Sequence, residues 1–135
     1  LTKSNEWTNY KFTVKIFARQ ATVTLIARYI DENNFLACTY SGRYVEIIQK
    51  VNGISNVVNS TTVVEAPYTR YFYNDLNLAM TVNNKTISCS LLGDDNIVYN
   101  NVDEKLQKGG IGIQVWSNSN GVANIEVKNV KVLPI

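Results

Sequence analysis

The sequence predicts an all-β fold, a single-domain antiparallel β-sandwich spanning residues 1–135. Three observations predict it. The chain has 135 residues with 45% hydrophobic side chains, which suits one domain with a proper core. Apolar residues recur at every second position in many short runs that are rich in β-branched and aromatic side chains. Turn-forming residues separate these runs at fairly regular spacing, as in sandwich proteins.

The alternation predicts which side chains of each run face the core. The inward sets, in chain order, are Phe12, Val14, Ile16, Ala18; Val23, Leu25, Ala27, Tyr29; Leu76, Leu78, Met80, Val82; Ile87, Cys89, Leu91; Ile111, Ile113, Val115; and Ile125, Val127, Val130, Val132. Asn83-Asn84-Lys85 lies between two such runs and predicts a tight hairpin. Helical character is confined to about one turn over residues 102–106.

Charge and composition argue against several classes of partner. The net charge is +2, from 13 basic and 11 acidic residues, which gives no electrostatic case for nucleic acid or an anionic membrane. The chain contains no run of 18 apolar residues that could span a bilayer, and no signal-peptide pattern. It opens at Leu1 without a methionine, so we expect a fragment of a larger protein. Abundant asparagine with little lysine and glutamate is typical of a secreted, extracellular β-protein.

Catalysis is not expected of this domain. There is no histidine, so neither Ser/His/Asp nor Cys/His chemistry can be assembled. A pair of carboxylates remains formally possible, with Glu46 and one of Asp31, Asp94 or Asp103. No motif fixes such a pair, and we therefore predict that the domain is not an enzyme.

The two cysteines, Cys38 and Cys89, form no metal-binding motif. Both occupy strand positions on an apolar face. The sequence leaves two alternatives open, buried free thiols or a disulfide between strands.

Four segments together carry a resemblance to known domains. They are "EWTNYKFTVKIFA", "ATVTLIARYIDENNFLACTYSGRYVEIIQKVNG", "YFYNDLNLAMTVNNKTISCSLLGD" and "GGIGIQVWSNSNGVANIEVKNVKV". The chain resembles concanavalin-A-like jelly rolls of the glucanase and laminin-G type, and most of all the family 66 carbohydrate-binding modules. These are small β-sandwiches appended to secreted polysaccharide hydrolases and lyases. The resemblance implies a jelly-roll fold and sugar binding.

A sugar site needs aromatic rings and planar polar groups on an outward sheet face. The alternation places Gln114 and Trp116 outward on one strand, Arg28 outward on another, and Tyr44 and Glu46 outward on a third. If these strands are neighbours, Glu46 could hold the Arg28 guanidinium toward a ligand. The alternatives are a purely structural Arg28–Glu46 pair, and a Trp116 that caps the edge of the core.

The ligand and the protein context follow from the resemblance only as expectations. A fructan or a pectic glycan is expected as the polysaccharide, and a glycosidase or pectate-lyase type catalytic domain as the partner in the parent chain. The alternative is a structural sandwich between domains that binds no sugar. No cofactor is required. A structural calcium is possible, with candidate oxygen ligands at Asp31, Glu32, Asp94, Asp95, Asp103 and Glu126.

Overall fold

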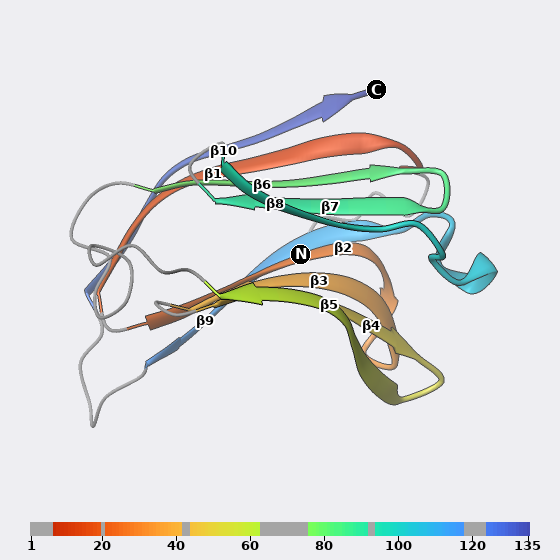
Figure 1. Cartoon of the computed structure of the whole chain (residues 1–135). Helices are drawn as coiled ribbons and strands as arrows, with labels where there is room; N and C mark the ends of the chain where they lie inside the picture. The colour runs from red at the N-terminus through yellow and green to blue at the C-terminus, as the bar shows by residue number, and fades with distance from the viewer. Residues whose placement is uncertain (1–6, 20, 42–43, 63–75, 92–93, 118–123) are drawn as a thin grey trace.

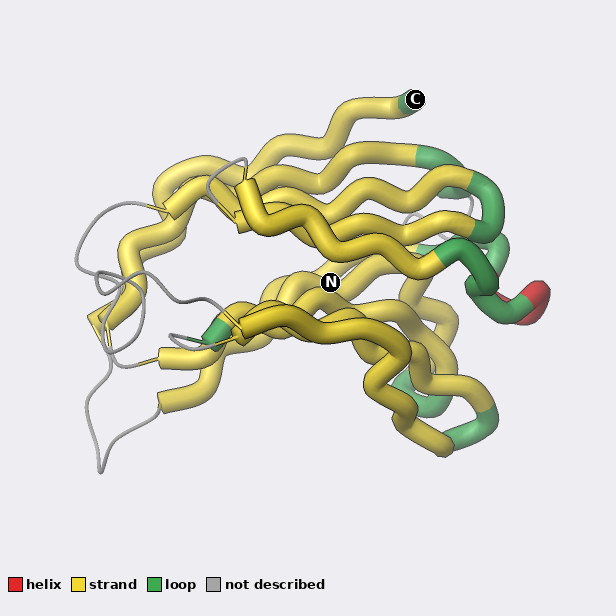
Figure 2. Tube along the Cα trace, viewed as in Figure 1, coloured by secondary structure: helices red, strands yellow, loops and turns green. Residues whose placement is uncertain are grey.

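The computed structural model of the chain describes residues 7–19, 21–41, 44–62, 76–91, 94–117 and 124–135. These residues form two antiparallel five-stranded sheets packed face to face (Figure 1, Figure 2), which confirms the predicted β-sandwich. One sheet has the order β10-β1-β6-β7-β8 and the other the order β5-β4-β3-β2-β9. The strands are β1 (Tyr10–Arg19), β2 (Ala21–Asp31), β3 (Asn34–Tyr40), β4 (Tyr44–Val51), β5 (Ile54–Thr62), β6 (Leu76–Asn83), β7 (Thr86–Leu91), β8 (Asp94–Tyr99), β9 (Gly110–Ser117) and β10 (Asn124–Pro134).

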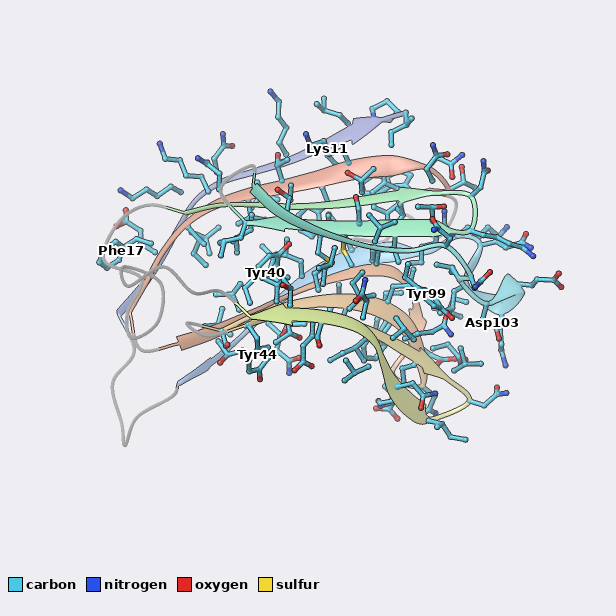
Figure 3. All side chains as sticks on the ribbon, in the orientation of Figure 1. Lys11, Phe17, Tyr40, Tyr44, Tyr99 and Asp103 are labelled. Carbon is cyan, nitrogen blue, oxygen red and sulfur yellow. A yellow bond between two sulfur atoms is a disulfide. The ribbon has the colours of Figure 1, made fainter. Side chains whose placement is uncertain are left out.

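The core lies between the two sheets and contains most of the side chains that the alternation predicts to be inward. Fully buried members are Phe12, Val14, Ile16, Val23, Leu25, Ala27, Leu78, Met80, Val82, Ile87, Cys89 and Leu91. Tyr40 extends between the sheets, where its hydroxyl donates a hydrogen bond of 2.8 Å to the carbonyl of Ala79 on β6 (Figure 3). The edge strand β10 departs from the expectation, since Val127 and Val130 are 44% and 46% exposed.

The turns follow the sequence signals. The β6–β7 hairpin turns at Asn84, which has a positive φ of 54° as asparagine tolerates. The predicted helical turn is a 3₁₀ helix, η1 (Glu104–Leu106), whose first turn is capped by the Asp103 carboxylate accepting from the Lys105 N–H. No helix in the described ranges is long and apolar enough to cross a bilayer.

The two cysteines form a disulfide, which decides between the alternatives that the sequence left open. Cys38 on β3 and Cys89 on β7 have Cα atoms 6.0 Å apart and side chains with no exposed surface. Each of these two strands is an inner strand of its sheet. The bond therefore joins the two sheets through the middle of the core.

The alternation of β2 breaks at Arg28. The register of β2 shifts after Ile26 against β9 and after Ala27 against β3, and Arg28 has a positive φ of 49°. Such a bulge inverts the phase of the residues that follow it. The prediction that Arg28 faces outward and Tyr29 inward is therefore wrong, because Arg28 is 1% exposed and Tyr29 lies half-buried on the outer face.

Gly109 permits this bulge. Its φ of 154° lies in a region that side chains disfavour, and a Cβ there would meet the carbonyl carbon of Arg28 at 2.5 Å. The segment before β9 can thus lie directly against the bulged backbone only with glycine at this position.

Candidate functional site

The outer face of the sheet β5-β4-β3-β2-β9 is the concave side of the sandwich. Both sheets bow in the same direction, and this sheet curves away from the core at both ends (Figure 2). Side chains that point away from the core on these five strands therefore lie on the concave surface of the curved sheet. Such a face can hold an extended ligand along its length.

A polar row crosses the concave face. Each strand contributes one side chain, and adjacent members are cross-strand partners in the sheet register, which places them on one face. The hydroxyl oxygens of Thr24 and Thr39 are 3.2 Å apart at its centre, where both residues are nearly buried. Gln114 is exposed at one end and Glu46 is half-buried toward the other. The polar row consists of Gln114, Thr24, Thr39, Glu46 and Ser60.

Tyr44 stands beside this row on β4, two residues before Glu46. Its side chain is 37% exposed and points away from the core (Figure 3). The strand is fixed here by a reciprocal pair in which the Tyr44 N–H donates to the Ser41 hydroxyl and the Ser41 N–H donates to the Tyr44 carbonyl, each at 3.0 Å. The structure thus brings together Tyr44, Glu46 and Gln114 on one face, as the alternation predicts.

Trp116 lies on β9, where its backbone pairs with Thr22. Its side chain lies outside the described residues. Stacking of this ring on a sugar therefore stays a prediction.

Arg28 does not belong to the concave face. Glu46 pairs with Thr39 and Thr39 pairs with Thr24, which is four residues from Arg28 along β2, so the predicted Arg28–Glu46 pair is wrong. The cause is the bulge, which turns Arg28 toward one end of the sandwich.

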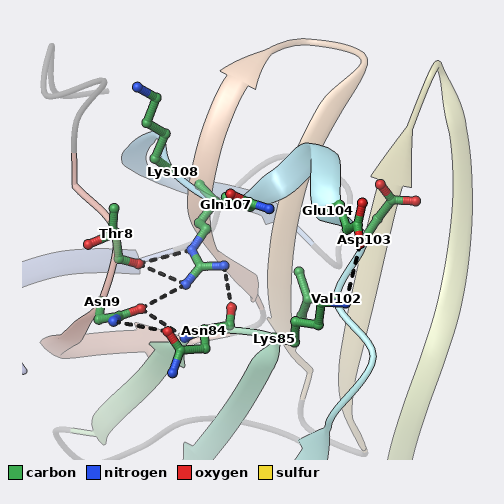
Figure 4. A pocket seen from close by; sticks show the side chains of 10 residues that line it. Thr8, Asn9, Asn84, Lys85, Val102, Asp103, Glu104, Gln107 and Lys108 are labelled. Atoms are coloured by element: carbon green, nitrogen blue, oxygen red, sulfur yellow. Dashed lines mark hydrogen bonds and ion pairs between the residues drawn. The ribbon is translucent and has the colours of Figure 1, made fainter.

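Five hydrogen bonds from the Arg28 side chain go to protein acceptors at that end. Figure 4 draws those to Thr8, Asn9 and Asn84 but not the one to Leu106. Nε and Nη2 donate to the Thr8 carbonyl at 3.0 and 2.8 Å, and Nη2 also donates to the Asn9 side chain at 3.2 Å. Nη1 donates to the carbonyls of Asn84 and Leu106 at 2.7 and 2.8 Å. These bonds use all five N–H groups of a guanidinium.

The electrostatics of Arg28 also indicate a structural role. Burial lowers the pKa of Arg28. The groups that accept hydrogen bonds from its guanidinium are uncharged, namely backbone carbonyls and the side-chain amide of Asn9. A pocket of about 590 Å³ borders the guanidinium, lined also by Lys85, Glu104 and Lys108. Since its donors are committed to the protein, Arg28 has none to offer a ligand there without breaking a native bond.

Two of the predicted calcium ligands, Asp31 and Asp103, serve local backbone geometry. One Asp31 oxygen accepts from the Asn34 side chain at 2.9 Å and from the Asn33 N–H at 2.8 Å, and these bonds lower the pKa of Asp31. Asp103 caps η1. Glu32 and Glu126 are exposed, and the side chains of Asp94 and Asp95 lie outside the described residues. Within the described part of the chain, no three His, Cys, Asp or Glu side chains are placed to share a metal ion.

Sequence reasoning missed part of the concave face. The alternation of residues 23–29 implies that Thr24 faces outward but assigns it no role, and it does not single out Thr39 and Ser60. Only the pairing register shows that these hydroxyls stand in line with Glu46 and Gln114. Tyr29 was missed because the bulge reverses its direction.

Comparisons with known proteins agree on the fold. No family model and no curated protein sequence matches the chain. A family 66 carbohydrate-binding module from Bacillus subtilis superposes with a TM-score of 0.71 at 14% identity, covering 93% of this chain and 74% of that one. Sheep galectin-11, in complex with glycerol, gives 0.65 at 11% identity, covering 97% and 95%. A homodimeric agglutinin from chicken liver gives 0.61 at 10% identity, covering 94% and 93%.

These similarities define the class of fold. The chain has the concanavalin-A-like jelly-roll sandwich that the sequence resemblance implied. More particularly, its architecture is similar to that of a family 66 module and of galectins.

Proposed function

We propose that this chain is a non-catalytic carbohydrate-binding domain that binds its glycan on the concave face. The observation that carries the proposal is the polar row, which sets one side chain from each of five strands in line beside the exposed ring of Tyr44. Proteins of similar fold include a carbohydrate-binding module and an agglutinin, which supports the proposal.

The chemistry of this face suits vicinal hydroxyl groups. The Glu46 carboxylate can accept hydrogen bonds from two hydroxyls of a sugar, and the Gln114 amide can both donate and accept. The hydrogen-bonded hydroxyls of Thr24 and Thr39 add polar groups at the centre of the polar row. The Tyr44 ring can cover the apolar face of a sugar ring while its hydroxyl stays in water. Glu46 is the sole carboxylate of the polar row, which supports binding without glycosidase chemistry.

The buried disulfide supports a secreted location, since such bonds persist in oxidising compartments. In that setting we propose that the domain targets a polysaccharide-degrading enzyme, a hydrolase or a pectate-lyase type enzyme, to a fructan or a pectic glycan. The catalytic domain of the parent chain would be its partner.

One observation favours a second candidate, a structural sandwich that contacts a neighbouring domain and binds no sugar. The edge strand β10 and the residue after it expose four apolar side chains at 44–63%. They are Val127, Val130, Leu133 and Ile135.

Replacing Glu46 by Gln tests the proposed site. We expect the affinity for the polysaccharide that the wild-type protein binds to fall tenfold or more, because a hydrogen bond to a charged group contributes roughly 1.5–3 kcal/mol. Affinity electrophoresis in gels containing levan, inulin or homogalacturonan identifies the polysaccharide, and calorimetry measures its affinity.

Glu126→Gln is the matched control, because it also removes one carboxylate charge, but from an exposed position on β10, an edge strand of the other sheet. If none of the three polysaccharides retards the wild-type protein, or if Glu46→Gln binds as tightly as Glu126→Gln, the proposed site is wrong.

A further inference from the structure

We propose that Tyr29, Phe35 and Lys50 form a second sugar-contact site at the other end of the concave face, so that the ligand is an oligosaccharide chain lying along the strands. This inference rests on the proposed function and extends it to the kind of ligand. We call these three residues the aromatic shelf.

The shelf is a defined cluster on three adjacent strands. The rings of Tyr29 on β2 and Phe35 on β3 are stacked, with centroids 6.0 Å apart and planes 24° from parallel. Lys50 on β4 is the cross-strand partner of Phe35, and its Nζ lies 5.5 Å from the centroid of that ring. All three side chains are half-buried, so the stacked rings keep accessible surface.

Register places the shelf on the same face as the polar row. Phe35 precedes Thr39 by four residues on β3, and Lys50 follows Glu46 by four residues on β4. An even separation keeps side chains on one face of a strand. The stacking with Phe35 then places Tyr29 there as well.

The bulge at Arg28 is what supplies the second ring. With unbroken alternation, Tyr29 would share the inward face of Leu25 and Ala27. The positive φ of Arg28, a conformation that residues other than glycine rarely adopt, reverses that phase. The five hydrogen bonds of its buried guanidinium hold this conformation in place.

The distance between the two contacts indicates the size of the ligand. Thr39 lies four positions after Phe35 on β3, which corresponds to about 13 Å along the strand. A single sugar ring cannot cover that span. Between the two contacts lies an aliphatic row of cross-strand partners, Ile26, Ala37 and Ile48. Ala37 is buried, while Ile26 and Ile48 are half-buried and can contact the C–H faces of intermediate sugars.

Lys50 gives the shelf its polar component. Its ammonium is held over the Phe35 ring and makes no ion pair with a carboxylate of the described residues. It can therefore donate hydrogen bonds to hydroxyl or carboxylate oxygens of a sugar stacked on the shelf. A chain of neutral sugars and a chain of uronates would both satisfy this chemistry.

The test measures affinity against chain length. Calorimetric titrations use two defined series, fructo-oligosaccharides and oligogalacturonides, each from monosaccharide to hexasaccharide. For the wild-type protein we expect affinity in the bound series to rise at least tenfold between the shortest and the longest members. Phe35→Leu should remove that rise, because it keeps an apolar side chain but no ring, whereas Phe35→Trp should keep it. Thermal unfolding of each variant verifies that it is folded.

The possible outcomes separate the shelf from the polar row. If short and long members bind the wild-type protein equally, or if Phe35→Leu keeps the full rise in affinity, the aromatic shelf is not a sugar contact. A loss of affinity in Glu46→Gln would then still support the proposed function. If no member of either series binds the wild-type protein, the proposed function and the shelf are both overturned. The bound series also shows whether the shelf takes neutral sugars or uronates.

Discussion

Replacing Arg28 by Met is expected to lower the free energy of unfolding by about 3–4 kcal/mol. Methionine keeps much of the buried aliphatic stem but donates no hydrogen bond. The carbonyls of Thr8, Asn84 and Leu106 then lose the donors that satisfy them. In a domain of this size the melting temperature should fall by roughly 10–15 °C. Chemical denaturation followed by circular dichroism measures the loss of free energy directly.

Two further variants make this result specific. Arg28→Lys keeps the charge but reduces five planar donors to three around one atom, so we expect a loss between those of wild type and Arg28→Met. Lys131→Met removes a charge from an exposed position on β10 and should change stability by no more than about 0.5 kcal/mol. A denaturation midpoint for Arg28→Met that equals the midpoint of Lys131→Met would contradict a structural role for the guanidinium.

Loss of the disulfide is the second large effect that we expect. Cys38 and Cys89 are 51 residues apart, and closing a loop of that size is expected to stabilise the folded state by about 4 kcal/mol on a chain-entropy model. The double variant Cys38→Ala/Cys89→Ala should lose about that amount. Because both sulfurs are buried, reductant should act on the wild-type protein mainly when it unfolds.

Urea unfolding of the wild-type protein with and without dithiothreitol provides the measurement without a substitution. The reduced protein should unfold at a lower urea concentration, and a thiol titration confirms that reduction is complete. The double variant should show no response to dithiothreitol. An unchanged midpoint after complete reduction would show that the bond contributes nothing to stability.

Strand alternation predicted which side chains of most strands face the core and which face outward. Phe12, Leu25 and Met80 face the core as expected, because one face of each strand must be apolar when two sheets pack together. The same rule placed Tyr44 and Glu46 on the outer face, since β4 has an unbroken register through these positions. The fold class and the outward positions of Tyr44, Glu46 and Gln114 therefore follow from the recurrence of apolar residues at every second position.

The rest depends on features that the period does not encode. Arg28 takes a backbone conformation usually given to glycine or asparagine, so nothing in the local sequence marks the bulge. Its acceptors come from segments that only the folded chain brings together. The pairing of Cys38 with Cys89 and the alignment of Thr24, Thr39 and Glu46 depend in the same way on strand order, which alternation leaves open.

The positions of the Arg28 acceptors have a consequence for the folding kinetics. Its partners Thr8, Asn84 and Leu106 lie 20, 56 and 78 residues away in the chain. Contacts of such long range form only after most of the chain is in place. Interactions absent from the transition state chiefly slow unfolding. We therefore expect Arg28→Lys to leave the folding rate in a chevron plot unchanged and to raise the unfolding rate. Arg28 would then be a determinant of the lifetime of the native state. An equal slowing of refolding would instead place this contact in the folding nucleus.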